Sequence, residues 1–255
     1  VRVFSLFVEG LENAREFYEC AKKITAKKPV VVYKAGKNEE VAKATLTHTG
    51  SLTGEYDLYR AMFKQAGLVE VDSAWDAAVA SKALAMLNLP EGDRVCAMTF
   101  TAGPSIVGMD RLLDAGWKFP DISDHARQGI RSVIGEKTPV ELQNPIDLTG
   151  LGFLPQNYSG VLEVLRDESF DAFFLVWSFS TLVRIPIAEI EKFVKDVKKP
   201  VVMVLLANQY EAERYLEELA RRRVCCYLTP EDGATALNAL LRRYKMLNRD
   251  RKVSN

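Results

Sequence analysis

The chain has 255 residues, of which 48% are apolar and 27% charged, and its 34 basic and 34 acidic residues give a formal net charge of zero. This length can bury one large core or two ordinary ones, and the composition is that of a soluble globular protein. The charge balance argues against whole-surface binding of nucleic acid or anionic lipid. The longest apolar runs are too short to span a bilayer.

The N-terminal residues contain no export signal, and the cysteines show no C-x-x-C spacing. We therefore expect a cytoplasmic protein with buried, reduced thiols, and neither a disulfide nor a metal site. The four residues concerned are Cys20, Cys96, Cys225 and Cys226.

Short β-branched runs alternate with helical stretches in the first third of the chain. Strands are predicted over residues 1–9, 29–34 and 68–71, and helices over 11–27, 55–66 and 73–87. The second strand, PVVVYK, is almost entirely apolar, which is typical of a parallel sheet covered on both faces. The Gly- and Thr-rich stretch 36–54 is predicted to be a long loop.

The Pro- and Gly-containing stretch 88–93 is the predicted linker, and the strand–helix alternation restarts after it. Strands are predicted over 94–100, 171–177, 200–206 and 224–228, with helices ending at 115 and over 122–134, 156–167, 186–198, 209–222 and 230–247. Residues 101–108 and 144–150 are predicted loops. The whole pattern predicts an α/β fold of two tandem doubly wound parallel-sheet domains, over residues 1–88 and 93–250.

His48 is one of only two histidines and lies among small hydroxylated residues, in THTGSLTG at 47–54. Thr49, Gly50 and Ser51 supply hydroxyls and unhindered backbone N–H groups, the donors that a phosphate needs. Imidazole nitrogen is a competent nucleophile at neutral pH when a partner holds the proton of the other nitrogen. The alternative is an ordinary surface histidine in a loop.

Glu9 is the candidate partner of this imidazole. It ends the first predicted strand, and the strand at 29–34 ends at Lys34, so the His48 loop leaves the same edge of the sheet. A carboxylate there would hold the imidazole tautomer and stabilise its cationic form. The alternative is a solvated carboxylate near a strand end.

In the second half, the strand at 94–100 runs into Ala102, Gly103, Pro104 and Ser105 and then into a helix. Glycine permits a tight turn, proline suits the first helical turn, and the open N–H groups favour an anion. The segment is a candidate phosphate cradle or an ordinary strand-to-helix turn, since it matches neither the Walker pattern nor G-x-G-x-x-G. The other histidine, His125, follows the predicted helix cap at Ser123 or Asp124, and a surface or structural role is expected for it.

Residues 29–73 are similar to the phosphohistidine segment of ADP-forming acetyl-CoA synthetases, in which K-x-G, S-H-T-G-S-L-x-G and F-x-Q-x-G-(V/I) follow one another. The family's histidine matches His48, with Thr47 in place of the usual serine, and the family's Glu-Gly pair matches Glu9 and Gly10. Residues 99–110 resemble the loop T-N-A-G-G-P-G-V-x-A-x-D, without its asparagine and second glycine. Residues 144–150 match N-P-(V/I)-D-L-x-G.

The resemblance, to the wider succinyl-CoA synthetase superfamily, implies flavodoxin-like domains, the first of them incomplete at its N-terminus. It implies a part of an acid–thiol ligase in which His48 carries a phosphoryl group and Glu9 stabilises it. The implied phosphate-binding residues are Thr49, Gly50, Ser51, Ala102, Gly103, Pro104 and Ser105.

The same resemblance implies partners that this chain lacks, namely a CoA-binding domain and an ATP-grasp domain or subunit, in an oligomer. Phosphate, acyl phosphate, CoA, ADP or ATP, and Mg²⁺ would be used by the complete enzyme, with Mg²⁺ arriving on the nucleotide and none of them clearly bound by this chain alone. Two non-catalytic alternatives stay open: a CoA-ligase-like regulatory module, and a binding domain for a small anion.

Overall fold

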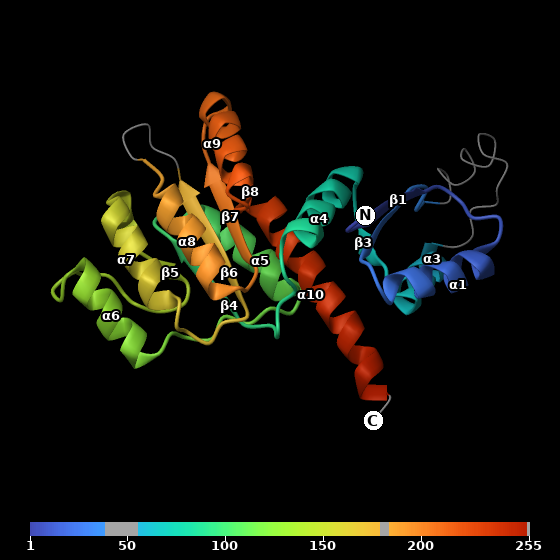
Figure 1. Cartoon of the computed structure of the whole chain (residues 1–255), viewed down its shortest axis with the longest axis horizontal. Helices are drawn as coiled ribbons and strands as arrows, with labels where there is room; N and C mark the ends of the chain where they lie inside the picture. Colours follow the sequence, from blue (N-terminus) through green and yellow to red (C-terminus); the bar gives the residue numbers. More distant parts are fainter. Residues whose placement is uncertain (39–55, 179–183, 254–255) are drawn as a thin grey trace. The chain divides into compact units, whose positions relative to one another are not determined.

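The computed structural model describes residues 1–38, 56–178 and 184–253 (Figure 1). These residues form two parallel sheets with helices between successive strands, so the predicted α/β class is confirmed. By their contacts the residues fall into two compact units, Val1–Ala85 with Ala239–Asn255, and Met86–Asn238. No helix within the described ranges combines the length and apolar character that crossing a bilayer requires.

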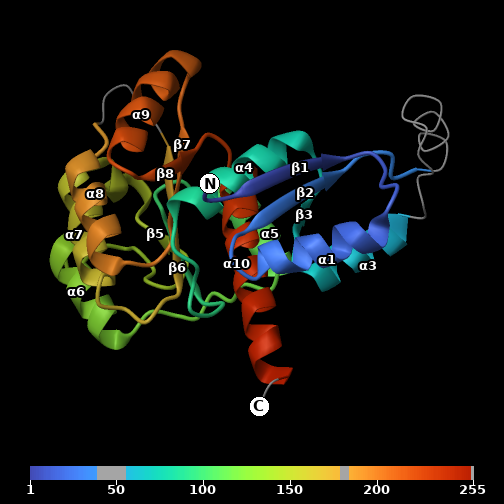
Figure 2. The same ribbon diagram turned by 45° about the vertical axis from the view of Figure 1, so that its right-hand side comes forward.

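The first unit is built on a three-stranded parallel sheet in the order β1-β2-β3. Its strands are β1 (Phe4–Val8), β2 (Val30–Lys34) and β3 (Val69–Val71), and its helices are α1 (Ala14–Thr25), α3 (Tyr56–Ala66) and α4 (Ala74–Met86). Figure 2 shows α1 and α3 along one face of this sheet and α4 along the other. A buried apolar cluster that includes Val8, Val32 and Phe63 joins the sheet to α1 and α3. The strands and helices that the sequence predicts here are confirmed, with small shifts at their ends.

The second half of helix α10 (Pro230–Val253) belongs to the first unit. The buried Arg243 donates a hydrogen bond from Nη2 to the carbonyl of Thr25 at 2.5 Å, and Arg242 donates from Nη1 to the carbonyl of Glu70 at 2.6 Å. Burial lowers the pKa of Arg243. These contacts attach the end of the chain to elements near its start.

The second unit has a five-stranded parallel sheet in the order β5-β4-β6-β7-β8. The strands are β4 (Val95–Thr99), β5 (Ile146–Asp147), β6 (Ala172–Ser178), β7 (Val201–Leu206) and β8 (Cys225–Tyr227). Counted within this unit, the order is 2-1-3-4-5, which is the flavodoxin order. Its direction of winding reverses between β4 and β6, so the ligand-binding crevice of such a fold is expected at the carboxyl ends of these two strands.

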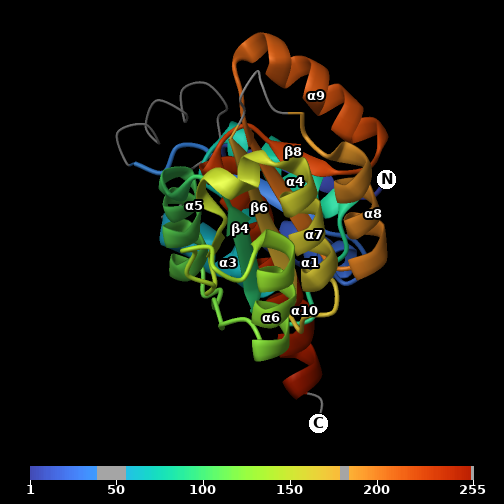
Figure 3. The ribbon, with the colours of Figure 1, turned by 90° about the vertical axis from the view of Figure 1, so that its left-hand side faces the viewer.

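Helices cover both faces of this sheet. They are α5 (Ala102–Asp114), α6 (Asp124–Ile134), α7 (Pro155–Leu165), α8 (Ile187–Val197) and α9 (Gln209–Arg221). Figure 3 looks onto α6, α7 and α8, whose buried side chains pack with Trp177 and its neighbours. On the opposite face α5 lies close to β6, because a Cβ added at Gly108 would stand 2.5 Å from Cζ of Phe174. Any larger residue at Gly108 would push α5 away from the sheet.

Three details differ from the sequence prediction. Helix α5 begins at Ala102, inside the stretch 101–108 that was predicted to be a loop. The predicted loop 144–150 contains the short strand β5 and the start of a 3-10 helix, η1 (Thr149–Phe153). Among the cysteines, Cys96, Cys225 and Cys226 are buried as expected, whereas Cys20 lies on the exposed side of α1.

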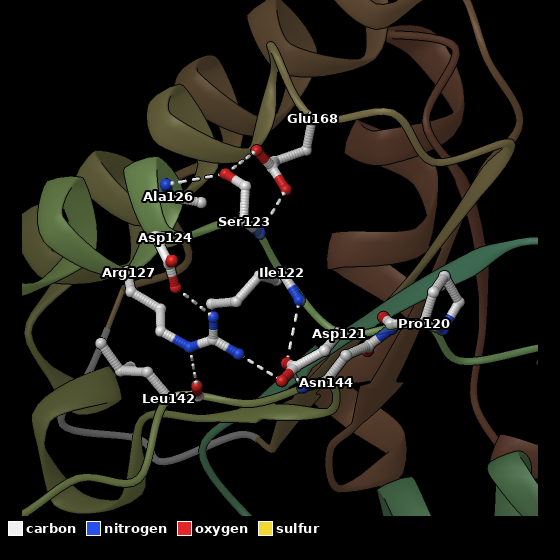
Figure 4. Close-up of polar contacts among 10 residues, drawn as sticks. All are labelled: Pro120, Asp121, Ile122, Ser123, Asp124, Ala126, Arg127, Leu142, Asn144 and Glu168. Carbon is white, nitrogen blue, oxygen red and sulfur yellow. Dashed lines mark hydrogen bonds and ion pairs between the residues drawn. The ribbon is translucent and has the colours of Figure 1, made fainter.

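The side chain of Asn144 continues the hydrogen bonding along β4 just before the start of β5. Its Oδ1 accepts from the backbone N–H of Ala97 at 3.0 Å, and its Nδ2 donates to the carbonyls of Val95 and Pro120, each at 2.8 Å. Figure 4 shows its neighbourhood, where the backbone N–H of Asn144 also donates to Asp121. One side chain therefore satisfies three backbone groups, and this gives the asparagine of the N-P-I-D-L-T-G stretch a structural role.

Replacing Asn144 with alanine is expected to lower the free energy of unfolding by about 2–3 kcal/mol, because part-buried backbone groups of β4 lose their partner. Urea denaturation followed by circular dichroism measures this change. The matched control is Gln143→Ala, one residue earlier and exposed. Equal losses in the two variants would contradict the structural role.

Candidate functional site

The carboxyl ends of β1 and β2 meet at one edge of the first sheet. The strands are parallel, with Val8 opposite Lys34, so Glu9 follows directly beside the end of β2. Lys34 donates a hydrogen bond from Nζ to the backbone carbonyl of Glu9 at 2.7 Å and another to the carbonyl of Ala35. Glu9 itself is half-buried. Its backbone carbonyl is therefore held at this edge by Lys34.

Lys34 is only 1% exposed. Its ammonium group lies 4.7 Å from the ring centroid of Tyr59, whose hydroxyl accepts a hydrogen bond from the N–H of Leu11 at 3.1 Å. Burial lowers the pKa of Lys34, and the negative charge of Glu9 only partly opposes this. The lysine thus fixes the backbone that carries Glu9. In the sequence Lys34 ends a predicted strand and opens the K-x-G pattern, and a charged residue that closes an apolar run is the signal for a buried lysine.

His48, Thr49, Gly50 and Ser51 lie outside the described residues. Lys37 and Tyr56 lie on either side of these four residues in the sequence, and they contact β3 and the residue that follows it. Lys37 Nζ lies 5.1 Å from the ring centroid of Tyr56 and 3.0 Å from Oδ1 of Asp72. Tyr56 donates its hydroxyl hydrogen bond to Oε1 of Glu70 at 2.7 Å. Lys37 and Tyr56 therefore both lie close to the end of β3, at the carboxyl edge of the sheet.

In the second unit, the predicted phosphate cradle is the first turn of α5. Thr101 precedes it in an extended conformation and makes no side-chain cap. Ala102 and Gly103 are exposed, and a Cβ added at Gly103 would touch nothing within 4 Å. The first N–H groups of a helix have no partner within the helix and attract anions. The hydroxyl of Ser105 is buried and directed at the sulfur of Met109, 3.8 Å away.

Hydroxyl groups gather beside this turn, where the winding of the sheet reverses. Thr101, after β4, and Ser178, at the end of β6, share a hydrogen bond between their side chains. Thr99 accepts at Oγ1 from the N–H of Thr101 at 3.0 Å. Thr99, Thr101 and Ser178 were not among the predicted site residues, although hydroxyl residues at two neighbouring strand ends are a signal in the sequence. They make the edge polar at the expected crevice of this fold.

His125 is exposed in the first turn of α6 and takes no part in either edge. The helix cap is Ser123, one of the two predicted candidates, and its Oγ accepts from the N–H of Ala126 at 3.0 Å. Glu168 holds the cap by accepting from Ser123 Oγ at 2.6 Å, as Figure 4 shows. The surroundings of His125 are therefore those of a helix start.

Comparison with known proteins gives consistent matches. A family model described as the succinyl-CoA ligase like flavodoxin domain matches residues 1–84. The alpha subunit of the ADP-forming acetate–CoA ligase II of Pyrococcus furiosus is 32% identical over 250 residues, which cover 96% of this chain and 54% of that protein. The ADP-forming 4-hydroxybutyrate–CoA ligase of Nitrosopumilus maritimus is 28% identical, over 94% of this chain and 34% of that protein.

Among solved structures, the dinucleotide forming acetyl-coenzyme A synthetase 1 of Ca. Korarchaeum cryptofilum, in complex with phosphate and ADP, matches with a TM-score of 0.86 and 26% identity. The match covers 99% of this chain and 55% of that one. The chain spans about half the length of the Pyrococcus relative, and a smaller part of the Nitrosopumilus one.

The flavodoxin strand order and these matches define a pair of CoA-ligase-type α/β domains. Residues 1–84 match the succinyl-CoA ligase like flavodoxin domain, and nearly the whole chain is similar to the alpha subunit of an ADP-forming acetate–CoA ligase.

Proposed function

We propose that this chain is part of an NDP-forming acyl-CoA synthetase and relays a phosphoryl group through His48. The observation that carries the proposal is the edge formed by the ends of β1 and β2, where Glu9 stands beside the buried Lys34. The segment that contains His48 starts five residues beyond Lys34. A carboxylate at that edge suits the orientation and charge of a histidine nucleophile.

The proposed relay has three steps. A phosphate oxygen attacks the thioester carbonyl of an acyl-CoA, which yields an acyl phosphate and releases CoA as its thiol. A nitrogen of His48 then attacks the phosphorus, and the carboxylate leaves. Finally, a terminal phosphate oxygen of ADP attacks the same phosphorus, so that ATP forms and the imidazole returns to its first state. Division into two transfers replaces one difficult step with two easier ones.

In this scheme the residues of the chain bind and orient. Glu9 stabilises the cationic imidazole, and Thr49, Gly50 and Ser51 surround the phosphoryl group. The first turn of α5, from Ala102 to Ser105, receives phosphoryl charge through its N–H groups, with the exposed N–H groups of Ala102 and Gly103 foremost.

The complete enzyme would join this chain to a CoA-binding domain and to an ATP-grasp domain or subunit, in an oligomer. Those parts would bind CoA and the nucleotide with its Mg²⁺. The relatives are named as ligases of acetate and of 4-hydroxybutyrate, which supports a carboxylic acid as the substrate.

Phosphorylation of the assembled enzyme tests the proposal. After incubation with labelled ATP and Mg²⁺, or with labelled acetyl phosphate, the chain is expected to carry an acid-labile, alkali-stable phosphate. His48→Ala is expected to abolish the label, because no other group would take the phosphoryl group. His125→Ala, which removes the only other histidine, is the matched control and should label like the wild type. An unlabelled wild type would favour a non-catalytic module instead.

A further inference from the structure

Within the first unit, α3, β3 and the second half of α10 enclose a cavity of about 640 Å³. This volume falls in the range of small-molecule sites in proteins. None of the residues that line it belongs to the set proposed above for phosphoryl transfer.

The walls of this cavity are basic on two sides. Arg60 and Lys64 stand one turn apart on α3, and Arg242 and Lys245 stand on α10. All four residues are exposed, and Arg242 also donates from Nη1 to the carbonyl of Glu70 at 2.6 Å. Within the described part of the chain, neither Arg60 nor Lys64 forms an ion pair. Basic residues of two helices therefore line one cavity, although the chain as a whole has no net charge.

The acidic residues of the lining are already engaged. Asp72 pairs with Lys37 at 3.0 Å, and Glu70 accepts the hydroxyl hydrogen bond of Tyr56 at 2.7 Å. Hydrogen bonds to Asp72 and Tyr56 raise the pKa of Lys37 despite the opposing effect of burial. The lining therefore keeps a net positive charge, which is carried by the basic residues of α3 and α10.

The floor of the cavity is apolar. Leu68 is buried beneath it, and the half-buried Met246 and Tyr56 add carbon surface. A single inorganic phosphate would leave this floor uncovered. A longer ligand with several phosphates and an organic group would use both the basic walls and the floor.

We propose that this cavity binds an organic diphosphate or triphosphate of the nucleoside diphosphate class, with its phosphates on Arg60, Lys64 and Arg242 and its organic group on Leu68 and Met246. This binding goes beyond the proposed relay, because it requires no phosphorylation of His48.

The test is equilibrium binding by calorimetry to the 255-residue chain, with ADP, pyrophosphate and adenosine as separate probes and no added metal. ADP is expected to bind most tightly, pyrophosphate more weakly because it lacks the organic group, and adenosine not at all. Added salt should weaken ADP binding, because the phosphates are held by exposed charges. Pyrophosphate binding as tight as that of ADP would overturn the contribution of the apolar floor.

The double variant Arg60→Gln/Lys64→Gln is expected to raise the Kd for ADP by at least about tenfold, since it removes charge-assisted hydrogen bonds from one wall. Arg242→Gln, on the other wall, should also weaken binding. The matched control is Arg15→Gln/Lys23→Gln, which removes the same charge from exposed positions of α1 in the same unit. Failure of ADP to bind, or equal weakening in the control, would overturn the site. Neither result bears on labelling of His48, so the two proposals fail separately.

Discussion

Replacing Glu9 with glutamine is expected to lower the rate of His48 phosphorylation by about 10- to 100-fold, the usual effect of removing a carboxylate that orients a histidine. The side chain keeps its size but loses the negative charge that would stabilise a cationic imidazole. The fold should be retained, because Lys34 bonds to the backbone carbonyl of residue 9 and not to its carboxylate. Rapid-quench labelling of the assembled enzyme measures the rate, and thermal unfolding checks the fold.

Glu12→Gln is the matched control for this experiment. Glu12 is an exposed carboxylate three residues later. Its replacement by glutamine removes the same charge at a position away from the strand end. Its labelling rate should stay at the wild-type value. A Glu9→Gln enzyme that labels as fast as Glu12→Gln would remove Glu9 from the proposed site.

Replacing Lys34 with methionine is expected to slow labelling by at least about tenfold while the free energy of unfolding at pH 7 changes by about 1 kcal/mol or less. Methionine keeps the apolar stem against Tyr59 and removes a charge that is costly to bury. It also releases the carbonyl of Glu9, so the backbone that presents the carboxylate loses its anchor. Labelling and urea denaturation on the same preparations measure the two effects.

The stability of the wild type relative to Lys34→Met should depend on pH in one direction. Burial lowers the pKa of Lys34 in the folded state, whereas in the unfolded chain it keeps the ordinary value of 10.5. Between these two values the unfolded chain binds more protons, so the stability of the wild type rises with pH. The cost of the buried charge is therefore fully present below the folded pKa and disappears as pH approaches 10.5. A relative stability that falls as pH rises would contradict a buried, charge-destabilised lysine.

The elements that sequence predicts best are those with a long and simple pattern. The apolar run of β2 and the helical spacing of α1 each carry their own signal, and both elements lie where expected. Strand β5 carries none, because two residues are too few for any periodicity. It forms because the exposed edge of β4 needs partners, which Ile146, Asp147 and the side chain of Asn144 supply. With β5 in place, the order becomes that of flavodoxin.

Some residues of the candidate site could likewise be predicted from the sequence, and others could not. Glu9 and the first turn of α5 were predicted because strand ends and glycine-containing turns can be read from local sequence. The contacts of Lys34, Thr101 and Ser178 became known only when neighbouring strands were placed, since their partners lie 25 and 77 residues away in the chain. The direction of the Ser105 hydroxyl, toward Met109 and away from the surface, depends on how α5 packs.

Hydrophobic periodicity is a local property of the chain, so the alternation of strands and helices, and with it the parallel α/β class, can be read directly from the sequence. The His48 motif can be read in the same way, because it is a run of neighbouring small residues. Which distant groups meet became known only in three dimensions: the lysine that holds Glu9, the hydroxyls where the winding reverses, and the basic walls that α3 and α10 build together. Such meetings depend on packing between elements far apart in the chain, and no local pattern of residues encodes them.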